Sequence, residues 1–130
     1  MKEYTNFDVG AFGEKECLKY IKKVKKYKII GKNITIKHLE ADIVAYDKDH
    51  IIIIEVKTRR DDKTNLFRPA MAVDNTKRTN LIRFAYSFVK TLPAKFQNKS
   101  PRIDVCEITV MAEKKLKLCS LNYIENAVTR

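Results

Sequence analysis

Acidic residues and a lysine stand at a suggestive spacing around the most apolar stretch of this chain. Glu55, Val56 and Lys57 directly follow the run of four isoleucines at 51–54, and Asp42 precedes that run. Side chains of a β-strand alternate between its two faces, so Glu55 and Lys57 share one face while Val56 points to the other. A buried strand could end in any polar residue, so the meaning of this charged ending depends on what lies opposite Glu55.

A short polar segment, DKDH, predicts a turn between a strand that ends at Tyr46 and one that begins at Ile51. If Tyr46 faces Ile51 in this hairpin, Asp42 lies directly across from Glu55. Directly opposed side chains have Cβ atoms about 4.5–5.5 Å apart, a distance at which two carboxylates repel. A divalent cation between them reverses the sign of the interaction, because both carboxylates then become ligands. The register therefore predicts a metal site.

Three more charged residues fit the same site. Glu40 lies across from Lys57 in the same register. Glu14 falls on the apolar side of a helix predicted over 8–26, where a carboxylate is costly unless it is paired or binds a metal. Lys77 stands at the start of a second helix, where it could reach a phosphate near the positive end of the helix dipole. Each residue alone could be an ordinary surface charge; their joint order favours a site.

The rest of the pattern predicts the elements that must hold these residues. Apolar residues at helical spacing predict helices over 8–26 and 75–90, the second capped by Asp74. Their apolar stripes comprise Cys17, Leu18, Ile21 and Val24 in the first helix and Leu81, Ala85, Phe88 and Val89 in the second. Strands are predicted over 28–31, 34–46, 51–59, 102–110 and 115–120, a charged loop over 60–69 and a helical turn over 123–128. This order indicates an α/β domain with a mixed sheet of about five strands flanked by helices.

Composition limits the class of protein. The 130 residues are expected to form one domain, residues 1–130. A net charge of +11, from 27 Lys and Arg against 16 Asp and Glu, favours an anionic partner such as nucleic acid, although a solvated lysine-rich surface would show the same charge. No apolar run approaches the roughly 20 residues of a membrane span and no signal peptide is evident, so we expect a cytoplasmic protein. The three cysteines are predicted to be reduced core residues.

Several segments together resemble the YraN family of predicted endonucleases, which is similar to archaeal Holliday junction resolvases. The segments are GEKECLKYI at 13–21, EADIVAYD at 40–47, EVKTR at 55–59, AVDNTK at 72–77 and RIDV at 102–105. Leu39 stands where the family usually has glycine. The resemblance implies a restriction-endonuclease-like fold, an active site of Glu14, Asp42, Glu55 and Lys57, and supporting roles for Glu40 and Lys77. Arg102 and Asp104 match a family motif to which we give no chemical role.

The expected activity is metal-dependent hydrolysis of phosphodiester bonds in DNA, with branched or junction DNA among the candidate substrates. Asp42 and Glu55 would hold Mg²⁺, for which Mn²⁺ would be able to substitute, and Glu14 would bind the ion directly or through water. Lys57 would position the attacking water or stabilise the charged transition state. The residues expected to grip phosphates are Arg59, Arg60, Lys63, Arg68, Lys77 and Arg78.

Other functions remain open at this point. The chain could be a non-catalytic nucleic-acid-binding protein, such as a degenerate nuclease or an RNA- or ribosome-associated protein, or a structural partner with a lysine-rich surface. The resemblance also makes a homodimer plausible. The absence of Trp and of interleaved aromatic and basic residues favours recognition of the backbone and shape of a nucleic acid over stacking on its bases.

Overall fold

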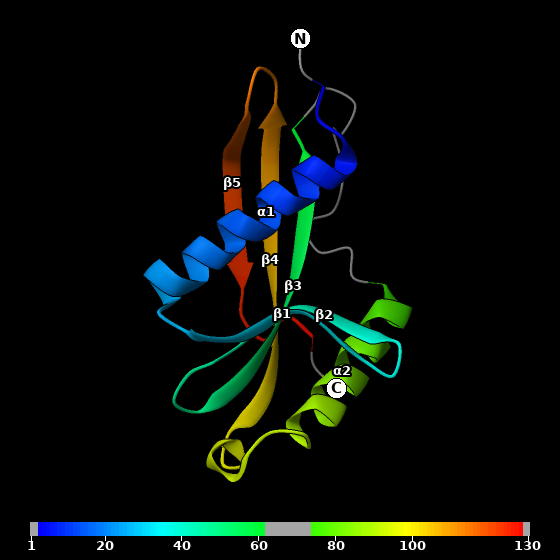
Figure 1. Ribbon diagram of the computed structural model, residues 1–130, viewed down its shortest axis with the longest axis vertical. Coiled ribbons are helices and arrows are strands. Elements are labelled where there is room, and N and C mark those ends of the chain that lie inside the picture. Colours follow the sequence, from blue (N-terminus) through cyan, green and yellow to red (C-terminus); the bar gives the residue numbers. More distant parts are fainter. Residues whose placement is uncertain (1–2, 62–73, 129–130) are drawn as a thin grey trace.

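The predicted order of elements is confirmed by the computed structural model, which describes residues 3–61 and 74–128 (Figure 1). The elements are α1 (Asn6–Tyr20), a π-helical turn (Ile21–Lys25), β1 (Lys28–Ile36), β2 (Leu39–Tyr46), β3 (His50–Arg60), α2 (Asn75–Val89), a 3₁₀ turn (Ala94–Phe96), β4 (Ser100–Ala112) and β5 (Leu116–Ile124). The strands form one sheet in the order β1-β2-β3-β4-β5, with β3 and β4 parallel and the other neighbours antiparallel. This mixed α/β sheet flanked by two helices has the architecture of a restriction-endonuclease-like fold.

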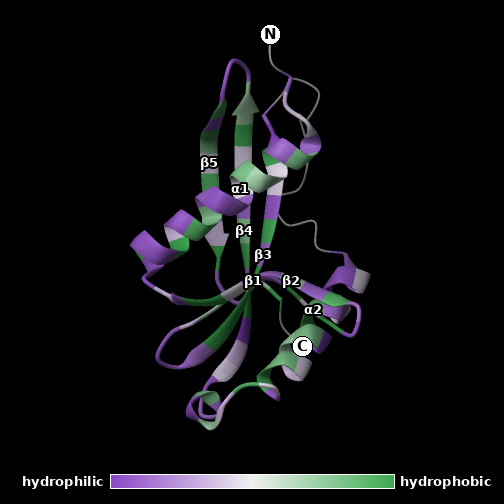
Figure 2. Ribbon diagram, viewed as in Figure 1, coloured by the Kyte–Doolittle hydropathy of each residue, from purple (hydrophilic) through white to green (hydrophobic). Residues whose placement is uncertain are grey.

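The two helices cover opposite faces of the sheet, and each closes its own apolar layer. On the α1 side, Cys17 and Ile21 pack with alternate residues of β2, β3 and β4, among them Ile54. On the α2 side, Leu81 and Phe84 pack against the other set of alternate residues. The run at 51–54 is therefore buried on both faces, as expected for a central strand. Figure 2 shows hydrophobic residues along the central strands and an alternation of hydrophilic and hydrophobic residues along α1.

The first helix begins two residues earlier than predicted and ends in an irregular turn. Thr5 caps it, because the Thr5 side chain accepts from the N–H of Asp8 while the Asp8 carboxylate accepts from the N–H of Thr5. At the other end the hydrogen bonds change from the i→i+4 to the i→i+5 pattern in the π-helical turn. The wider turn rotates Val24 away from the core, so Val24 is 61% exposed and its predicted place in the apolar stripe is wrong.

The predicted boundary between the first two strands is also wrong. The sequence indicated a short strand at 28–31 and a long one over 34–46, whereas β1 runs to Ile36 and the turn falls at Lys37 and His38. Both turn residues have positive φ, 48° and 68°, as a two-residue type I′ hairpin turn requires. Such turns usually contain Asn or Gly, so this one lacks its sequence signal.

The sheet divides in its middle (Figure 1). The predicted register between β2 and β3 is confirmed from Tyr46–Ile51 to Ile43–Ile54, and the pairing stops there. Beyond this point β2 stays paired with β1 as far as Leu39, while β3 stays paired with β4 as far as Arg60. We call this division between β2 and β3 the fork of the sheet.

A buried ion pair on β4, beside Ile54 of β3, fixes the end of β5 and corrects the predicted C-terminus. Asp104 is fully buried and accepts from Arg102 at 2.8 and 2.9 Å, from Tyr123 Oη at 2.6 Å and from the N–H of Asn126 at 2.8 Å. Both carboxylate oxygens are thus satisfied, as burial of a charge requires. Because Asp104 holds the chain here, β5 extends to Ile124 and a turn follows, so the helical turn predicted over 123–128 is wrong.

The cysteines follow the prediction in two cases of three. Cys17 and Cys106 are free and buried, but Cys119 is exposed because it lies on β5, at the edge of the sheet.

Among the described residues, no helix combines the length and the apolar character needed to cross a bilayer.

Helix α1 approaches β3 closely at one residue. A Cβ atom placed on Gly13 would lie 2.6 Å from Cγ2 of Thr58, well inside contact distance, whereas one placed on Gly10 would meet nothing within 4 Å. Thr58 is β-branched, so its side chain cannot easily turn away. Gly13 therefore sets the distance between α1 and β3, and with it the position of the neighbouring Glu14.

Replacing Gly13 by alanine should force α1 away from β3. We expect Gly13→Ala to lower the free energy of unfolding by about 1–3 kcal/mol through overpacking, measured by urea denaturation. Gly10→Ala is the matched control, because a helical glycine with open space around it should gain up to about 1 kcal/mol on the same change. Equal effects of the two substitutions would contradict the close packing.

Candidate active site

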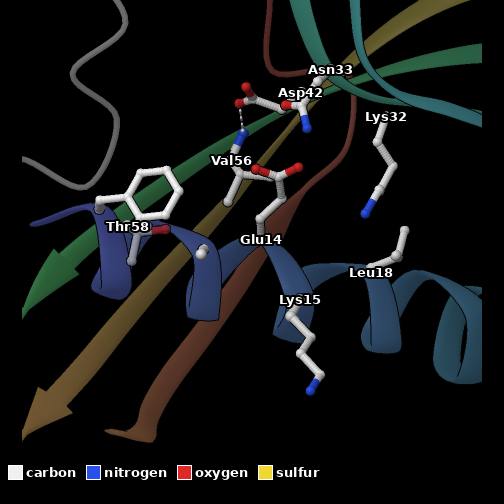
Figure 3. A pocket seen from close by; sticks show the side chains of 11 residues that line it. Glu14, Lys15, Leu18, Lys32, Asn33, Asp42, Val56 and Thr58 are labelled. Atoms are coloured by element: carbon white, nitrogen blue, oxygen red, sulfur yellow. Dashed lines mark hydrogen bonds between the residues drawn. The ribbon is translucent and has the colours of Figure 1, made fainter. Parts of the chain in front are cut away.

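Asp42 lies at the fork and replaces the missing strand partner of β3. Its Oδ2 accepts a hydrogen bond of 2.8 Å from the backbone N–H of Val56 (Figure 3). In a continuous antiparallel ladder this N–H would be bonded to a carbonyl of β2. The carboxylate thus satisfies a backbone donor that the divergence of β2 leaves behind, and the bond fixes the orientation of Asp42 in turn.

Glu55 lies beside Asp42 and faces α2. Its side chain is almost entirely buried, with 5% of the residue exposed, and its Oε2 lies 3.2 Å from Nζ of Lys77. Despite this ion pair, Oε2 accepts no properly directed hydrogen bond. Lys77 stands in the first turn of α2, where Asp74 caps the helix by accepting from the N–H of Lys77 at 2.7 Å. The predicted N-cap is confirmed, and it holds the ammonium group over Glu55.

Burial and the neighbouring acid make Glu55 a weaker acid than an exposed glutamic acid side chain. Its pKa rises from 4.5 to about 7, first because burial penalises the charged form and then through the charge of Asp42 and a hydrogen bond with that side chain. Lys77 opposes the rise through its own charge. The predicted approach of Asp42 and Glu55 is therefore present in the structure, together with its electrostatic cost.

Glu14 approaches the fork from α1. Glu14 and Asp42 line the same cavity of about 940 Å³, and Figure 3 shows the Glu14 carboxylate turned toward the strands that carry Asp42 and Val56. Within residues 3–61 and 74–128, however, no three acidic, histidine or cysteine side chains lie close enough to bind one ion together. Of the two roles predicted for Glu14, this separation favours contact with an ion through water.

Two of the other predicted residues have different positions. Lys57 is half-buried in β3, two residues beyond Glu55 and on the same side of the strand, as predicted. Glu40 does not lie across from Lys57, because the sheet has already divided; it is exposed and pairs with Thr35 of β1. Its predicted supporting place beside Lys57 is wrong.

The predicted phosphate-binding residues are spread along the end of β3 and the start of α2. Arg59 and Arg60 are half-buried at the end of β3, and the Arg60 guanidinium donates to the carbonyl of Tyr4. Arg78 is exposed in the first turn of α2. Lys63 and Arg68 lie outside the described residues.

The walls of the cavity that Glu14 and Asp42 share were not predicted from the sequence. The residues that add to it include Phe7 and Leu18 of α1 and Lys32 and Asn33 of β1. Phe7 and Leu18 stand at helical spacing from Glu14, so the sequence pattern could have placed them on the same side of α1 as Glu14. No sequence pattern could have placed Lys32 and Asn33 in the cavity wall, since their position depends on the type I′ turn that joins β1 to β2.

The donor set at the fork fits a hard divalent cation. Asp42 and Glu55 offer carboxylate oxygens from adjacent strands, and Oε2 of Glu55 is a buried acceptor without a hydrogen bond. Mg²⁺ and Mn²⁺ prefer oxygen ligands, and Mg²⁺ retains several waters, so two direct carboxylates are sufficient. A cation there would also remove the repulsion between the two acids.

The raised pKa of Glu55 should appear in the stability of the metal-free protein. The folded state binds more protons than the unfolded state between about pH 4.5 and 7, so the free energy of unfolding should fall as the pH rises through this window and level off above it. A shift of this size corresponds to roughly 3 kcal/mol. Urea denaturation in EDTA at several pH values should show the fall in the native protein and not in Glu55→Gln. Parallel pH profiles for the two proteins would contradict the raised pKa.

Comparison with known proteins places these residues in a family. Residues 13–108 match the model of the "Uncharacterised protein family UPF0102". A UPF0102 protein of Caldanaerobacter subterraneus is 36% identical over 127 residues, covering 98% of this chain and 99% of its own. A UPF0102 protein of Caldicellulosiruptor saccharolyticus is 35% identical over 120 residues, covering 92% and 96%. One from Clostridium botulinum is 34% identical over 117 residues, covering 88% and 93%.

Proposed function

The chain belongs to the UPF0102 family, the group that includes YraN, and we propose that it is a metal-dependent nuclease that hydrolyses phosphodiester bonds in DNA. The observation that carries the proposal is the pair of carboxyl groups, Asp42 and Glu55, held together at the fork. Lys57 lies two residues beyond Glu55 on the same strand. Two acids forced together at an energetic cost are typical of functional sites. The restriction-endonuclease-like architecture and the resemblance to junction resolvases support the same activity by analogy.

Asp42 and Glu55 would hold Mg²⁺ or Mn²⁺, with Glu14 reaching it through water. When bound, such an ion polarises a phosphate and lowers the pKa of water. Val56 contributes its backbone N–H, which fixes the Asp42 carboxylate. Because one oxygen of Asp42 is already engaged by this bond, the direction of the other is fixed as well.

Lys57 and Lys77 would act on the substrate through charge. Lys57, half-buried beside Glu55, would orient the attacking water or stabilise the negative charge that develops on the phosphate. Lys77 would leave Glu55 and contact a phosphate once a cation neutralises the acid pair. Since Asp74 already occupies the N–H of Lys77, the ammonium group rather than that backbone donor would make the contact.

DNA is the partner we propose, and the cytoplasm is the compartment. The net charge of +11 favours a polyanion, and Arg59, Lys77 and Arg78 stand near the site on β3 and α2. Binding through such residues should weaken steeply with salt. A homodimer would allow both strands of a duplex or junction to be cut, and we include it in the proposal.

The direct test is a cleavage assay on labelled four-way, flap, single-stranded and linear duplex DNA, with Mg²⁺, Mn²⁺ or EDTA. We expect metal-dependent cutting by the native protein and a rate lower by about 100-fold or more in Glu55→Gln, since even outer-shell partners of a metal are worth 10–100-fold. Binding of the same DNA, measured by anisotropy, should be kept or improved, because one negative charge is removed. If the native protein binds DNA or RNA without cutting any substrate, the non-catalytic reading is correct instead.

Glu14 and Glu16 offer a matched pair on α1. Glu14 faces the cavity, whereas Glu16 forms an ion pair with Lys19 of the same helix and does not line the cavity. We expect Glu14→Gln to lower the rate of metal-dependent cleavage by about 10- to 100-fold, as for a residue that orients the water around a metal. Glu16→Gln removes the same charge and should leave the rate unchanged. An equal loss in both variants would show a general effect of charge and remove Glu14 from the site.

A further inference from the structure

A second face of α1 lines the cavity beside the proposed active site. Phe7, Gly10 and Glu14 lie at intervals of three and four residues, which places them along one side of the helix. The buried stripe of Val9, Gly13, Cys17 and Ile21 runs directly beside this side of the helix. Helix α1 therefore serves both the core and an open groove, which we define by Phe7, Gly10, Glu14, Lys32, Asn33 and Asp42.

Phe7 stands in this groove with its aromatic ring in solvent. It is 82% exposed, and among the exposed large hydrophobic side chains of the described residues it is the one that lines the groove. A single exposed hydrophobic residue is ordinary, but this ring lies in the first turn of a helix that the capping box at Thr5 holds in place. Next to it, Gly10 leaves open space where any other residue would place a side chain.

The opposite wall of the groove is polar and basic. Lys32 and Asn33 belong to β1, both are exposed, and both line the groove across from α1 (Figure 3). Asn33 has a φ of 49°, in the left-handed region that asparagine tolerates better than most residues. The groove thus offers an aromatic face for a base, an ammonium and an amide for phosphates, and the carboxylates of Glu14 and Asp42 further along.

We propose that this groove binds a DNA strand with an unpaired base stacked on Phe7, so that the substrate carries an unpaired base close to the phosphate that is cut. The inference rests on the proposed nuclease function and narrows its substrate class to flaps, single-stranded segments and branched DNA that carries unpaired bases. Bases inside a continuous duplex are stacked on their neighbours and offer no free face to a phenyl ring. Recognition is then not confined to the backbone and shape that the sequence pattern favoured.

The spacing along α1 fits this arrangement. Phe7 and Glu14 are seven residues apart, which is about 10 Å along a helix that rises 1.5 Å per residue. That length corresponds to about three nucleotide steps at the 3.4 Å spacing of duplex DNA, and to fewer steps of an extended strand. The stacked base would therefore lie within a few nucleotides of Glu14, which shares the cavity with Asp42.

The absence of tryptophan from this chain makes a direct test simple. Phe7→Trp creates a single tryptophan in the proposed stacking position, and Val24→Trp places one at an exposed residue outside the groove as the control. Both are titrated in EDTA with single-stranded, flapped and continuous duplex DNA, with binding followed separately by anisotropy of a labelled strand. We expect the emission of Phe7→Trp to be quenched by single-stranded and flapped DNA and hardly by duplex, and that of Val24→Trp to stay constant.

The affinities of two variants for DNA separate the contribution of base stacking from that of charge. Phe7→Ala should weaken the binding of single-stranded and flapped DNA by about 5- to 100-fold, leave duplex binding and the thermal midpoint unchanged, and keep the salt dependence. Lys32→Gln should weaken all DNAs alike and lower the slope of log affinity against log salt by about one. Phe7→Trp should retain the affinity of the native protein.

The outcomes distinguish this inference from the nuclease proposal, because binding is measured without metal. Unchanged emission of Phe7→Trp at saturating single-stranded DNA, or unchanged affinity of Phe7→Ala, would overturn the stacking site even if the native protein cuts DNA with Mg²⁺. Quenching of the Phe7→Trp emission, without cleavage of any DNA by the native protein, would support the stacking site and contradict the nuclease function. Tighter binding of RNA than of DNA of the same sequence would overturn the assignment to DNA.

Discussion

The arrangement of the site depends on one hydrogen bond, from the N–H of Val56 to the carboxylate of Asp42. Strand β2 leaves β3 after the Ile43–Ile54 pair, and an interior backbone donor without an acceptor would be costly. Asp42 supplies the acceptor with its side chain, so β1 and β2 can turn away while β3 continues beside β4. The same departure leaves space for Glu14 and the groove along α1, so the division of the sheet is also the origin of the cavity.

The second constraint is electrostatic. Asp42 and Glu55 meet at the fork, where burial of Glu55 and the charge of Asp42 raise the pKa of Glu55 to about 7, and Lys77 offsets only part of the cost. Asp104 on the neighbouring strand β4 shows how this fold stabilises a carboxylate that has only a structural role. There Asp104 is fully satisfied by Arg102, Tyr123 and a backbone N–H. The contrast between Asp104 and Glu55, whose Oε2 accepts no properly directed hydrogen bond, supports a functional reading of Glu55.

The approach of Asp42 to Glu55 was predictable because it depends on local geometry. The turn after Tyr46 is closed by Asp47, whose side chain accepts from the N–H groups of Asp49 and His50, and this fixes the register of the following strand. Counting outward from the turn then places the two acids correctly. The same counting failed at Glu40, because a register argument assumes that two strands remain paired, and no feature of the sequence marks where they separate.

The sequence by itself determined the order of the elements, the α/β class, the Asp74 cap of the second helix, and the strand that carries Glu55 and Lys57, because apolar periodicity, capping residues and polar turns act over a few neighbouring residues. Only the tertiary structure decided that the sheet divides at Asp42, that Gly13 allows α1 to approach Thr58, that Val24 turns outward, and that Phe7, Lys32 and Asn33 share a groove with Glu14. Those features join residues distant in the chain. Their cost or gain in free energy exists only once the elements have packed, so no local pattern could reveal them.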